Sequence, residues 1–203
     1  STRVASVALF DGRQVLSETT WLAGREHSTR LLIETEACLA RIGQTPADLG
    51  GLVVARGPGS FTGVRVAVSV AKGMAAALGL PAWGVSTLQA TAAAAGEVTL
   101  PVRAVLEAGR GRYATALYQG DACVEPPRLT TLAQLTDLVA TPTIVIGELD
   151  EPAREQLAAR PTARLASRAA SLRRGGFVAE IGWRLARSGD PGDPRALDAL
   201  YVS

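Results

Sequence analysis

The segment from Leu52 to Ala90 constrains the fold of this chain more than any other part of the sequence. A short apolar run, Leu52 to Ala55, leads into a turn rich in glycine and proline, and a long helical pattern follows from about Phe61 to Leu78. A second short apolar run ends at Ser86. Strand, glycine-rich loop, helix and strand in this order predict a helix N-terminus, with its unpaired N–H groups, at the end of a sheet. We therefore expect an α/β protein.

The loop ahead of this helix does not match the common nucleotide-binding motifs. A P-loop requires Gly-Lys followed by Ser or Thr, so that the lysine reaches the phosphates and the hydroxyl binds magnesium, whereas Gly63 is followed by Val64 and Arg65. Two interpretations stay open: Ser60 caps the helix behind a tight turn, or the loop binds an anion. The residues of the candidate anion site are Arg56, Gly57, Pro58, Gly59, Ser60, Thr62 and Gly63.

The predicted helix from Phe61 to Leu78 is apolar around most of its circumference. Its only charges, Arg65 and Lys72, flank Ser69 on a narrow polar strip. A surface helix of a monomer should be polar over about half of its circumference. We expect a second layer of the chain or a partner protein to cover the helix, and we favour a partner, because large apolar patches mark interfaces. One apolar stripe contains Val64, Ala67, Val68, Ala71, Ala75 and Leu78, and the second contains Val66, Val70, Gly73 and Ala77.

The residues from Arg56 to Leu88 read RGPGSFTGVRVAVSVAKGMAAALGLPAWGVSTL. This run resembles, almost residue by residue, the central motif of the bacterial TsaB (YeaZ) family, whose members help to make threonylcarbamoyladenosine beside the tRNA anticodon. The segment from Arg25 to Ser28 resembles the family's REHS helix, and Ala199 to Val202 resembles its C-terminal motif, with Ser203 in place of an arginine. The resemblance is close over residues 1–90 and looser beyond them.

The resemblance implies an α/β fold of the duplicated actin-like (ASKHA, ribonuclease H-like) type with two small subdomains. The expected elements agree with it, because hairpin, helix, strand, helix, strand and helix occur on both sides of Gly96. We place an N-terminal subdomain with the docking helices at residues 1–96 and a C-terminal subdomain at residues 97–203. Family members open with a strand ending in Asp-Thr-Ser-Thr, of which Ser1 and Thr2 are present. We expect the rest of that strand to lie outside this sequence.

Apolar periodicity and turn residues predict the individual elements. Asp11-Gly12 predicts a two-residue hairpin turn, and Pro152 fits the first turn of a helix. The expected strands are Val4–Phe10, Gln14–Trp21, Leu52–Ala55, a short strand ending at Ser86, Val102–Glu107, Tyr113–Tyr118, Cys123–Pro127, Thr143–Ile146 and Ala163–Ala166. The expected helices are His27–Ile42, Phe61–Leu78, one whose end spans Ala90–Gly96, Leu132–Val139, Pro152–Ala159 and Phe177–Arg187.

Composition sets a few outer limits. A chain of 203 residues that is 47% hydrophobic can bury one sizeable core or two small ones. No apolar run reaches the roughly 20 residues that cross a bilayer. No charged segment followed by an apolar one indicates a secretory leader. Cys38 and Cys123 lack the spacing of a metal or redox site. We expect a reduced cytoplasmic protein without a membrane segment. The net charge of +2 gives little indication of nucleic-acid binding.

His27 is the one histidine of the chain. TsaD, a catalytic relative of this family, carries His-x-x-x-His at the corresponding helix to hold a metal, and Leu31 stands where the second histidine would be. A nitrogen and sulfur metal site cannot be assembled from one histidine and two distant cysteines. We therefore expect no metal site and no metal-dependent catalysis, and we interpret His27 as a structural or interface residue.

The same residues bear on two enzymatic alternatives, a peptidase and a phosphotransferase. A peptidase would need Ser60 or Ser86 beside His27, with Asp11 or Asp48 orienting the imidazole, and no Gly-x-Ser-x-Gly turn supports it. An actin-like phosphotransferase needs acidic phosphate loops in both halves. The second half offers Glu107-Ala108-Gly109, with Arg112 where the family has a glutamate. We expect no catalytic residues, no cofactor in the isolated chain, and ATP or ADP only at an interface within a complex.

Arginines gather toward the C-terminus of the chain. A solvated face in an arginine-rich proteome explains them, and the functional alternative is a surface that contacts tRNA phosphates. No aromatic residues alternate with the arginines to strengthen the second interpretation. They are Arg160, Arg164, Arg168, Arg173, Arg174, Arg184 and Arg187.

The sequence predicts a non-catalytic scaffold that docks a TsaD-like catalytic subunit. We expect a TsaE-like ATPase as a further partner, a homodimer when the chain is alone, and tRNA contact through the catalytic partner. The alternative is a small actin-like ATP-dependent phosphotransferase or a glycoprotease-like peptidase. The expected interface residues are His27, Leu31, Leu32, Thr35, Cys38, Leu39, Val66, Val70, Gly73 and Ala77.

Overall fold

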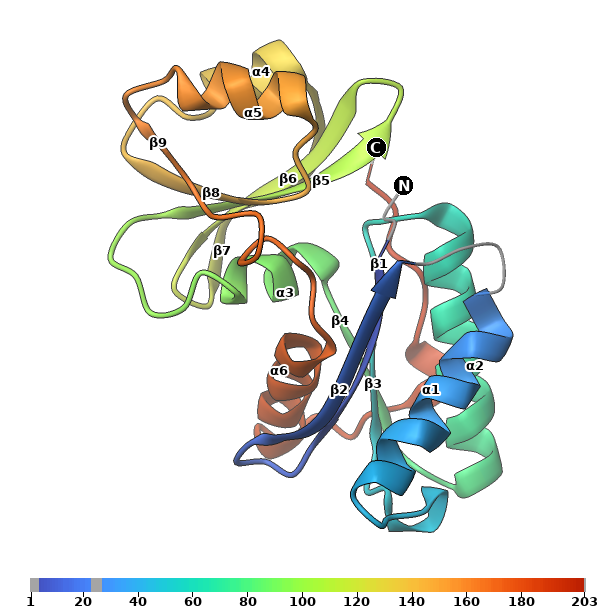
Figure 1. Ribbon diagram of the computed structural model, residues 1–203. Helices are drawn as coiled ribbons and strands as arrows, with labels where there is room; N and C mark the ends of the chain where they lie inside the picture. The colour runs from blue at the N-terminus through green and yellow to red at the C-terminus, as the bar shows by residue number, and fades with distance from the viewer. Residues whose placement is uncertain (1–3, 23–26, 203) are drawn as a thin grey trace.

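A computed structural model describes residues 4–22 and 27–202 of the chain, and it is an α/β protein built from two halves (Figure 1). The first half contains β1 (Val4–Phe10), β2 (Val15–Leu22), α1 (His27–Arg41), the 3-10 turn η1 (Pro46–Asp48), β3 (Leu52–Ala55), α2 (Phe61–Leu78), β4 (Ala82–Val85) and α3 (Thr87–Ala93). The second half contains β5 (Val102–Gly109), β6 (Arg112–Gln119), β7 (Ala122–Thr131), α4 (Leu132–Asp137), β8 (Thr143–Gly147), α5 (Glu151–Ala158) and β9 (Ala163–Leu165). Two last elements, α6 (Gly175–Arg187) and the 3-10 turn η2 (Pro194–Ala196), complete the chain.

The expected elements are present in the expected order, and the differences lie at their ends. The β1–β2 turn spans residues 11–14, because Phe10 pairs with Val15. The predicted two-residue turn is therefore wrong. The carboxylate of Asp11 accepts hydrogen bonds from the N–H groups of Arg13 and Gln14, both 2.8 Å long, and this side-chain turn takes the place of a two-residue hairpin.

Strand β7 is longer than the sequence indicated. Pro126 and Pro127 were expected to end it, yet it continues to Thr131. β7 is one of the two edge strands of its sheet. Its pairing with β6 shifts where the prolines lie, because Leu117 pairs with Glu125 and Thr115 with Arg128. Proline lacks an N–H group and is tolerated at such an irregular edge.

The two halves differ in their sheets. The second half has one five-stranded sheet in the order β7-β6-β5-β8-β9, with β5 antiparallel to β6 and parallel to β8. Among the residues that the structure describes, the first half has two separate pairs, the antiparallel β1–β2 and the parallel β3–β4. Within residues 4–22 and 27–202, the first half thus contains the outer pairs of a similar sheet, with no described strand between them.

Packing does not follow the order of the chain. Helix α6 comes after the second half, but it packs against β1, β2, β3 and β4, as Figure 1 shows. The N–H of Gly175 donates to the hydroxyl of Ser6 over 2.9 Å, and a Cβ on Gly182 would overlap the side chain of Val53. Helix α6 is therefore a layer of the first half. The division into units at residues 1–96 and 97–203 stays a prediction about how the chain folds.

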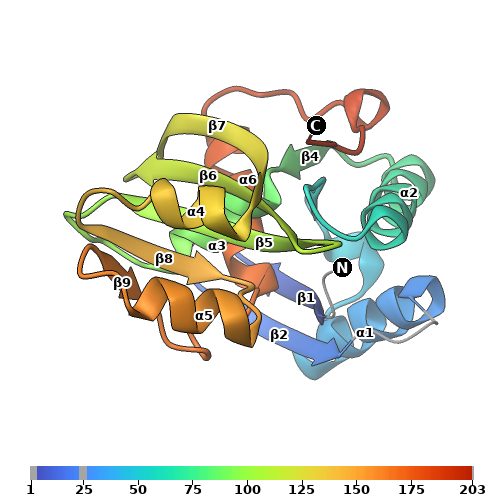
Figure 2. The same ribbon diagram turned by 90° about the horizontal axis from the view of Figure 1, so that it is seen from above.

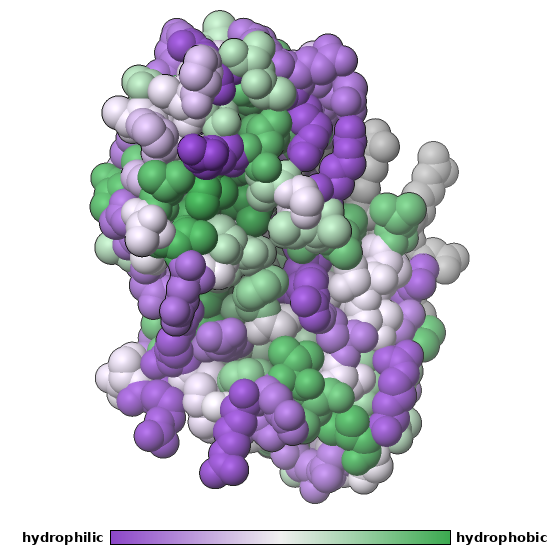
Figure 3. Space-filling view, turned by 60° about the vertical axis from the view of Figure 1, so that its left-hand side comes forward, coloured by the Kyte–Doolittle hydropathy of each residue, from purple (hydrophilic) through white to green (hydrophobic). Residues whose placement is uncertain are grey.

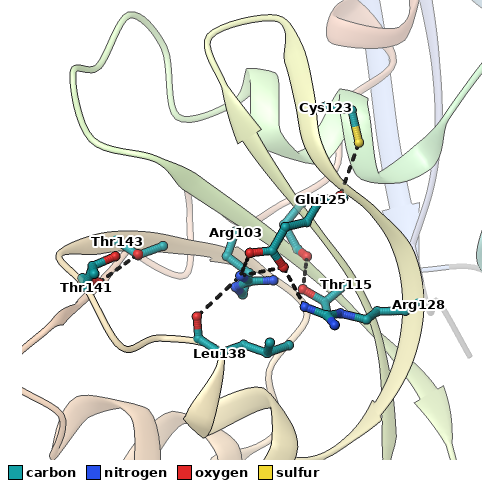
Figure 4. A network of polar contacts seen from close by, with 9 residues as sticks. Arg103, Thr115, Cys123, Glu125, Arg128, Leu138, Thr141 and Thr143 are labelled. Carbon is teal, nitrogen blue, oxygen red and sulfur yellow. Dashed lines mark hydrogen bonds and ion pairs between the residues drawn. The ribbon is translucent and has the colours of Figure 1, made fainter.

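A buried arginine fastens the sheet of the second half (Figure 4). Arg103 on β5 is 1% exposed, and its guanidinium donates to both carboxylate oxygens of Glu125 at 3.1 Å and to the carbonyl of Leu138 at 3.3 Å. Arg128 binds the same carboxylate at 2.6 Å. Burial lowers the pKa of Arg103, and its bonds with Glu125 oppose that shift. A charge this deeply buried requires such partners.

Candidate docking surface and glycine-rich loop

The glycine-rich loop is organised around the start of α2. The hydroxyl of Ser60 accepts a hydrogen bond from the N–H of Gly63 over 3.3 Å, which makes Ser60 the N-cap of the helix. At the other end Gly79 has a φ of 66° and closes the helix in the left-handed conformation that favours glycine. Capping by Ser60 is therefore confirmed, while anion binding by the loop stays a prediction.

The C-terminal segment fixes the same loop from outside. The N–H of Leu200 donates to the carbonyl of Arg56 over 2.6 Å, and the N–H of Thr87 donates to the carbonyl of Gly57 over 2.8 Å. Gly57 has a φ of 110°, and a side chain there would overlap the carbonyl oxygen of Leu200. Glycine at position 57 is thus required both by its conformation and by the close approach of the C-terminal segment.

That segment also covers the polar strip of α2. The guanidinium of Arg65 lies 3.8 Å from the ring centre of Phe61 and donates to the hydroxyl of Tyr201 over 2.7 Å. Lys72 lies 3.6 Å from the carboxylate of Asp198, and Leu197 is 4% exposed within an apolar cluster that includes Val68 and Ala71 on α2 and Ala82 on β4. Figure 2 shows the segment running beside β4 and α2. The sequence indicated no partner for Arg65 or Lys72, because the contacts join residues more than a hundred positions apart.

Helices α1 and α2 pack side by side on one flank of the first half (Figure 1). Leu32 and Ile33 of α1 are 44% and 57% exposed, and Gly73 and Ala77 of α2 are also exposed, with no atom within 4 Å of the position that a Cβ on Gly73 would take. Together these four residues are called the outer face. Ile33 was not among the residues expected at the interface, although its exposure exceeds that of Leu32.

Other expected interface residues face inward. Cys38 and Leu39 are 0% and 3% exposed, so they belong to the core and not to a surface in this conformation. The sulfur of Cys38 lies 3.6 Å from the hydroxyl of Thr19 on β2. Helical periodicity could not separate the core face of α1 from its outer face, because apolar residues occupy both. Leu31, Thr35 and Val70 line a partly open cavity between β1 and β3, and Val66 is half-buried. The side chain of His27 lies outside the described residues, as do Ser1, Thr2, Arg25, Glu26 and Ser203.

Two acidic residues near the junction of the two halves, Glu148 and Asp150, are paired. The guanidinium of Arg173 lies 3.1 Å from the carboxylate of Glu148, and Glu107 lies near enough to influence it. Burial raises the pKa of Glu148, and the charge of Arg173 opposes this rise. Tyr113 donates to Asp150 over 2.8 Å, and burial followed by this hydrogen bond raises the pKa of the phenol. Within residues 4–22 and 27–202, no group of three or more metal-binding side chains occurs.

Three of the residues named for the peptidase alternative, Asp11, Asp48 and Ser60, serve local structure. Asp11 binds its own turn, and Asp48 accepts from the N–H and the hydroxyl of Thr45 at 2.8 Å. These hydrogen bonds, led by those from the backbone, lower the pKa of both carboxyls. Ser60 caps α2. The described contacts therefore do not assemble a nucleophile with a base.

The C-terminal arginines do not form one basic surface. Most of them pair with acids from different parts of the chain: Arg160 with Asp137, Arg168 with Glu151, Arg173 with Glu148, Arg174 with Glu18 and Arg184 with Asp121. Among the residues that the structure describes, Arg164 and Arg187 take part in none of these pairs. Paired and dispersed charges have little attraction left for a phosphate backbone.

Comparison with known proteins identifies the family. Residues 21–156 match the family described as "TsaD: tRNA N6-adenosine threonylcarbamoyltransferase". Two relatives carry the name tRNA threonylcarbamoyladenosine biosynthesis protein TsaB: one from Bacillus subtilis is 35% identical over 56% of this chain and 49% of its own length, and one from Escherichia coli is 37% identical over 60% and 53%. The chain belongs to this family, in its TsaB (YeaZ) branch.

The sequence matches cover about half of each chain, whereas the structural matches cover nearly the whole of both chains. The chain spans about half the length of the curated TsaB relatives that it matches. A solved structure of a Pseudomonas aeruginosa protein, described as similar to the peptidase YeaZ, superposes with a TM-score of 0.83 at 24% identity over 99% of this chain and 95% of that chain. A second, described as YeaZ from the same organism, gives 0.81. The actin-like fold expected from the sequence is therefore confirmed.

By length and composition alone, α2 could cross a membrane. It contains Arg65 and Lys72, which bind Tyr201 and Asp198, and one of its faces packs on β3. Core helices of globular proteins also pass this test, so the feature alone does not indicate a membrane protein.

Proposed function

We propose that the protein is a non-catalytic subunit in the synthesis of threonylcarbamoyladenosine in tRNA, and that its outer face on α1 and α2 docks a TsaD-like catalytic subunit. The names of its TsaB relatives support the process. The exposed apolar residues of two neighbouring helices support docking, since such patches mark interfaces. The paired acids at the junction support a subunit without its own chemistry.

The observation that carries docking is the combination of Leu32 and Ile33 with the open space over Gly73. Hydrophobic patches also occur on the face that Figure 3 shows, so exposure alone does not select this surface. What favours the outer face is that small residues on α2 let another helix approach closely beside large apolar residues on α1. A helix pair of this composition suits packing against helices of a partner.

The test is binding to a purified TsaD-like protein. We expect Ile33→Glu to weaken binding at least tenfold, because a charge would be buried in the interface. Val124→Glu is the matched control, since Val124 is 53% exposed on β7, far from α1 in the chain, and it should bind as the wild type does. Equal binding by both variants would remove the outer face from the proposal.

A second variant tests whether a helix of the partner approaches α2 closely. Ala77→Phe places a bulky side chain on the exposed side of the helix. We expect the monomer to unfold cooperatively while binding weakens, because overpacking a tight contact costs about 1–3 kcal/mol. We also propose that this surface forms a homodimer when the chain is alone, and light scattering on Ala77→Phe should then report a monomer.

The remaining proposals concern cofactors, other partners and location. We propose that ATP or ADP binds only where the assembled complex provides a joint site, that a TsaE-like ATPase joins that complex, that tRNA is contacted through the catalytic partner, and that the assembly is cytoplasmic. Calorimetry of the isolated chain with an ATP analogue and Mg²⁺ should give no binding heat. Saturable binding would instead favour the phosphotransferase alternative.

A further inference from the structure

Glu36 lies on the exposed side of α1, among the apolar residues of the outer face. It follows Leu32 by four positions and Ile33 by three, and residues at these spacings are neighbours on the surface of a helix. All three are exposed, and so is Ala40, one further turn along the helix. The side of α1 that carries two residues of the outer face therefore carries one carboxylate among apolar side chains.

The two glutamates of this stretch of α1 differ in their surroundings. Glu34 forms an ion pair of 3.4 Å with Arg30, and its side chain is 16% exposed. Within the described part of the chain, Glu36 takes part in no ion pair. Water therefore solvates the charge of Glu36 in the monomer. A protein that covers this side of α1 removes that water, which costs free energy unless the carboxylate gains a new partner.

A second copy of the chain is poorly suited to supply that partner. In a two-fold dimer both subunits contribute the same patch, so each Glu36 would meet the outer face of the other subunit. Pairing with Glu36 would take a cation of α1 or α2 away from a contact that it already has. The described cations of the two helices that have a partner in their own chain are Arg30, Arg41, Arg65 and Lys72. A homodimer through the outer face thus buries two carboxylates without a free cation for either.

We propose that Glu36 determines which protein occupies the outer face: it pairs with a cationic side chain of the TsaD-like catalytic subunit, and it weakens self-association of the chain. This inference rests on the proposed function, because it assumes that the outer face docks that subunit. A different protein can place a lysine or arginine opposite the carboxylate at no cost to an existing pair. An unpaired charge against the wrong partner is a general source of specificity.

The test is to measure two assemblies with one variant, Glu36→Gln, which removes the charge and keeps the size of the side chain. Calorimetry should show at least tenfold weaker binding to a purified TsaD-like protein, because the cation of the partner stays buried without its carboxylate. Analytical ultracentrifugation should show at least tenfold stronger self-association, as a lower dissociation constant or as a dimer where the wild type is a monomer. A residue that only supports the structure of α1 would change both assemblies in the same direction.

Two further variants show whether the effect comes from the charge at this position. Glu36→Asp keeps the carboxylate, so it should retain the behaviour of the wild type in both assemblies. Glu155→Gln removes a charge at an exposed position of α5 and should change neither assembly. A parallel change in both assemblies by Glu36→Gln, an unchanged value in either of them, or equal behaviour of Glu36→Asp and Glu36→Gln would overturn the proposal.

Ile33→Glu distinguishes failure of this inference from failure of the proposed function. If Ile33→Glu weakens binding of the catalytic subunit and Glu36→Gln does not, the outer face docks that subunit and only the role of Glu36 is wrong. If Ile33→Glu leaves both assemblies unchanged, the outer face is not the interface, and the role of Glu36 is refuted together with the docking surface.

Discussion

Both halves of this molecule contain two strand pairs in the same arrangement, but in the described residues only the pairs of the second half are joined by a strand. In the second half β5 joins the pairs, and its residues Val105 and Leu106 are 0% and 1% exposed. In the first half a cavity of about 770 Å³ separates the pairs, and β1 has no fully buried residue. β1, which borders the cavity, is half-buried along its length, whereas β5, which is paired on both edges, lies in a close-packed core.

The largest expected effect is on the free energy of unfolding, when a leucine is replaced by alanine once in each half. Leu157→Ala, in α5 under the complete sheet, removes a fully buried side chain. Leu39→Ala, in α1, removes a side chain that is 3% exposed but already borders the cavity. Leucine-to-alanine changes in cores cost about 2–5 kcal/mol. We expect Leu157→Ala near the top of this range and Leu39→Ala near the bottom.

Denaturant unfolding of the two variants measures the difference. A cost for Leu39→Ala equal to or above that of Leu157→Ala would mean that the first half is as tightly packed as the second. It would remove the contrast between the halves.

The next largest effect concerns α6, which follows the second half in the chain but packs against the first half. Gly182→Ala on α6 would place a methyl group against Val53 of β3. We expect the free energy of unfolding to fall by about 1–3 kcal/mol, because the added carbon overpacks a tight contact. Thermal unfolding checks it. A stabilised variant would show that α6 is loosely held on the first half.

A smaller effect of opposite sign is expected on the outer face. Gly73→Ala adds a methyl group on α2 where no atom lies within 4 Å. Alanine is more favourable than glycine inside a helix by about 0.5–1 kcal/mol, so the free energy of unfolding of the monomer should rise. Opposite effects of Gly73→Ala and Gly182→Ala on the free energy of unfolding would distinguish the open face of α2 from the packed face of α6. Destabilisation by Gly73→Ala would mean that another group already occupies this space.

The smallest effect is a pH dependence at the junction of the halves. Burial raises the pKa of Glu148 above 4.5, so the folded state binds its proton more tightly than the unfolded state does. Stability from this group is therefore greatest below 4.5 and declines as the pH rises toward the folded-state pKa. Glu148→Gln should lose this decline. Denaturant unfolding of both proteins from pH 4 upward measures it, and parallel curves would show that Glu148 does not couple folding to pH.

Local signals in the sequence predicted most elements correctly. Ser60, one of the two interpretations of the glycine-rich loop, caps α2, because a cap depends on residues within one turn. The central motif from Arg56 to Leu88 indicated the family. The β1–β2 turn and the end of β7 were wrong, because the Asp11 side chain and the edge position of β7 changed what Gly12 and Pro126 could do.

The sequence by itself determined the order of strands and helices, the helix caps and the family of this protein, since these depend on neighbouring residues. The tertiary structure alone decided that Leu39 faces the core while Ile33 faces outward, and that Tyr201 reaches Arg65 across 136 positions. It also decided that β1 and β3 border a cavity. Periodicity gives the number of apolar faces on a helix or strand, but which of them is covered depends on distant segments, whose positions come only from folding.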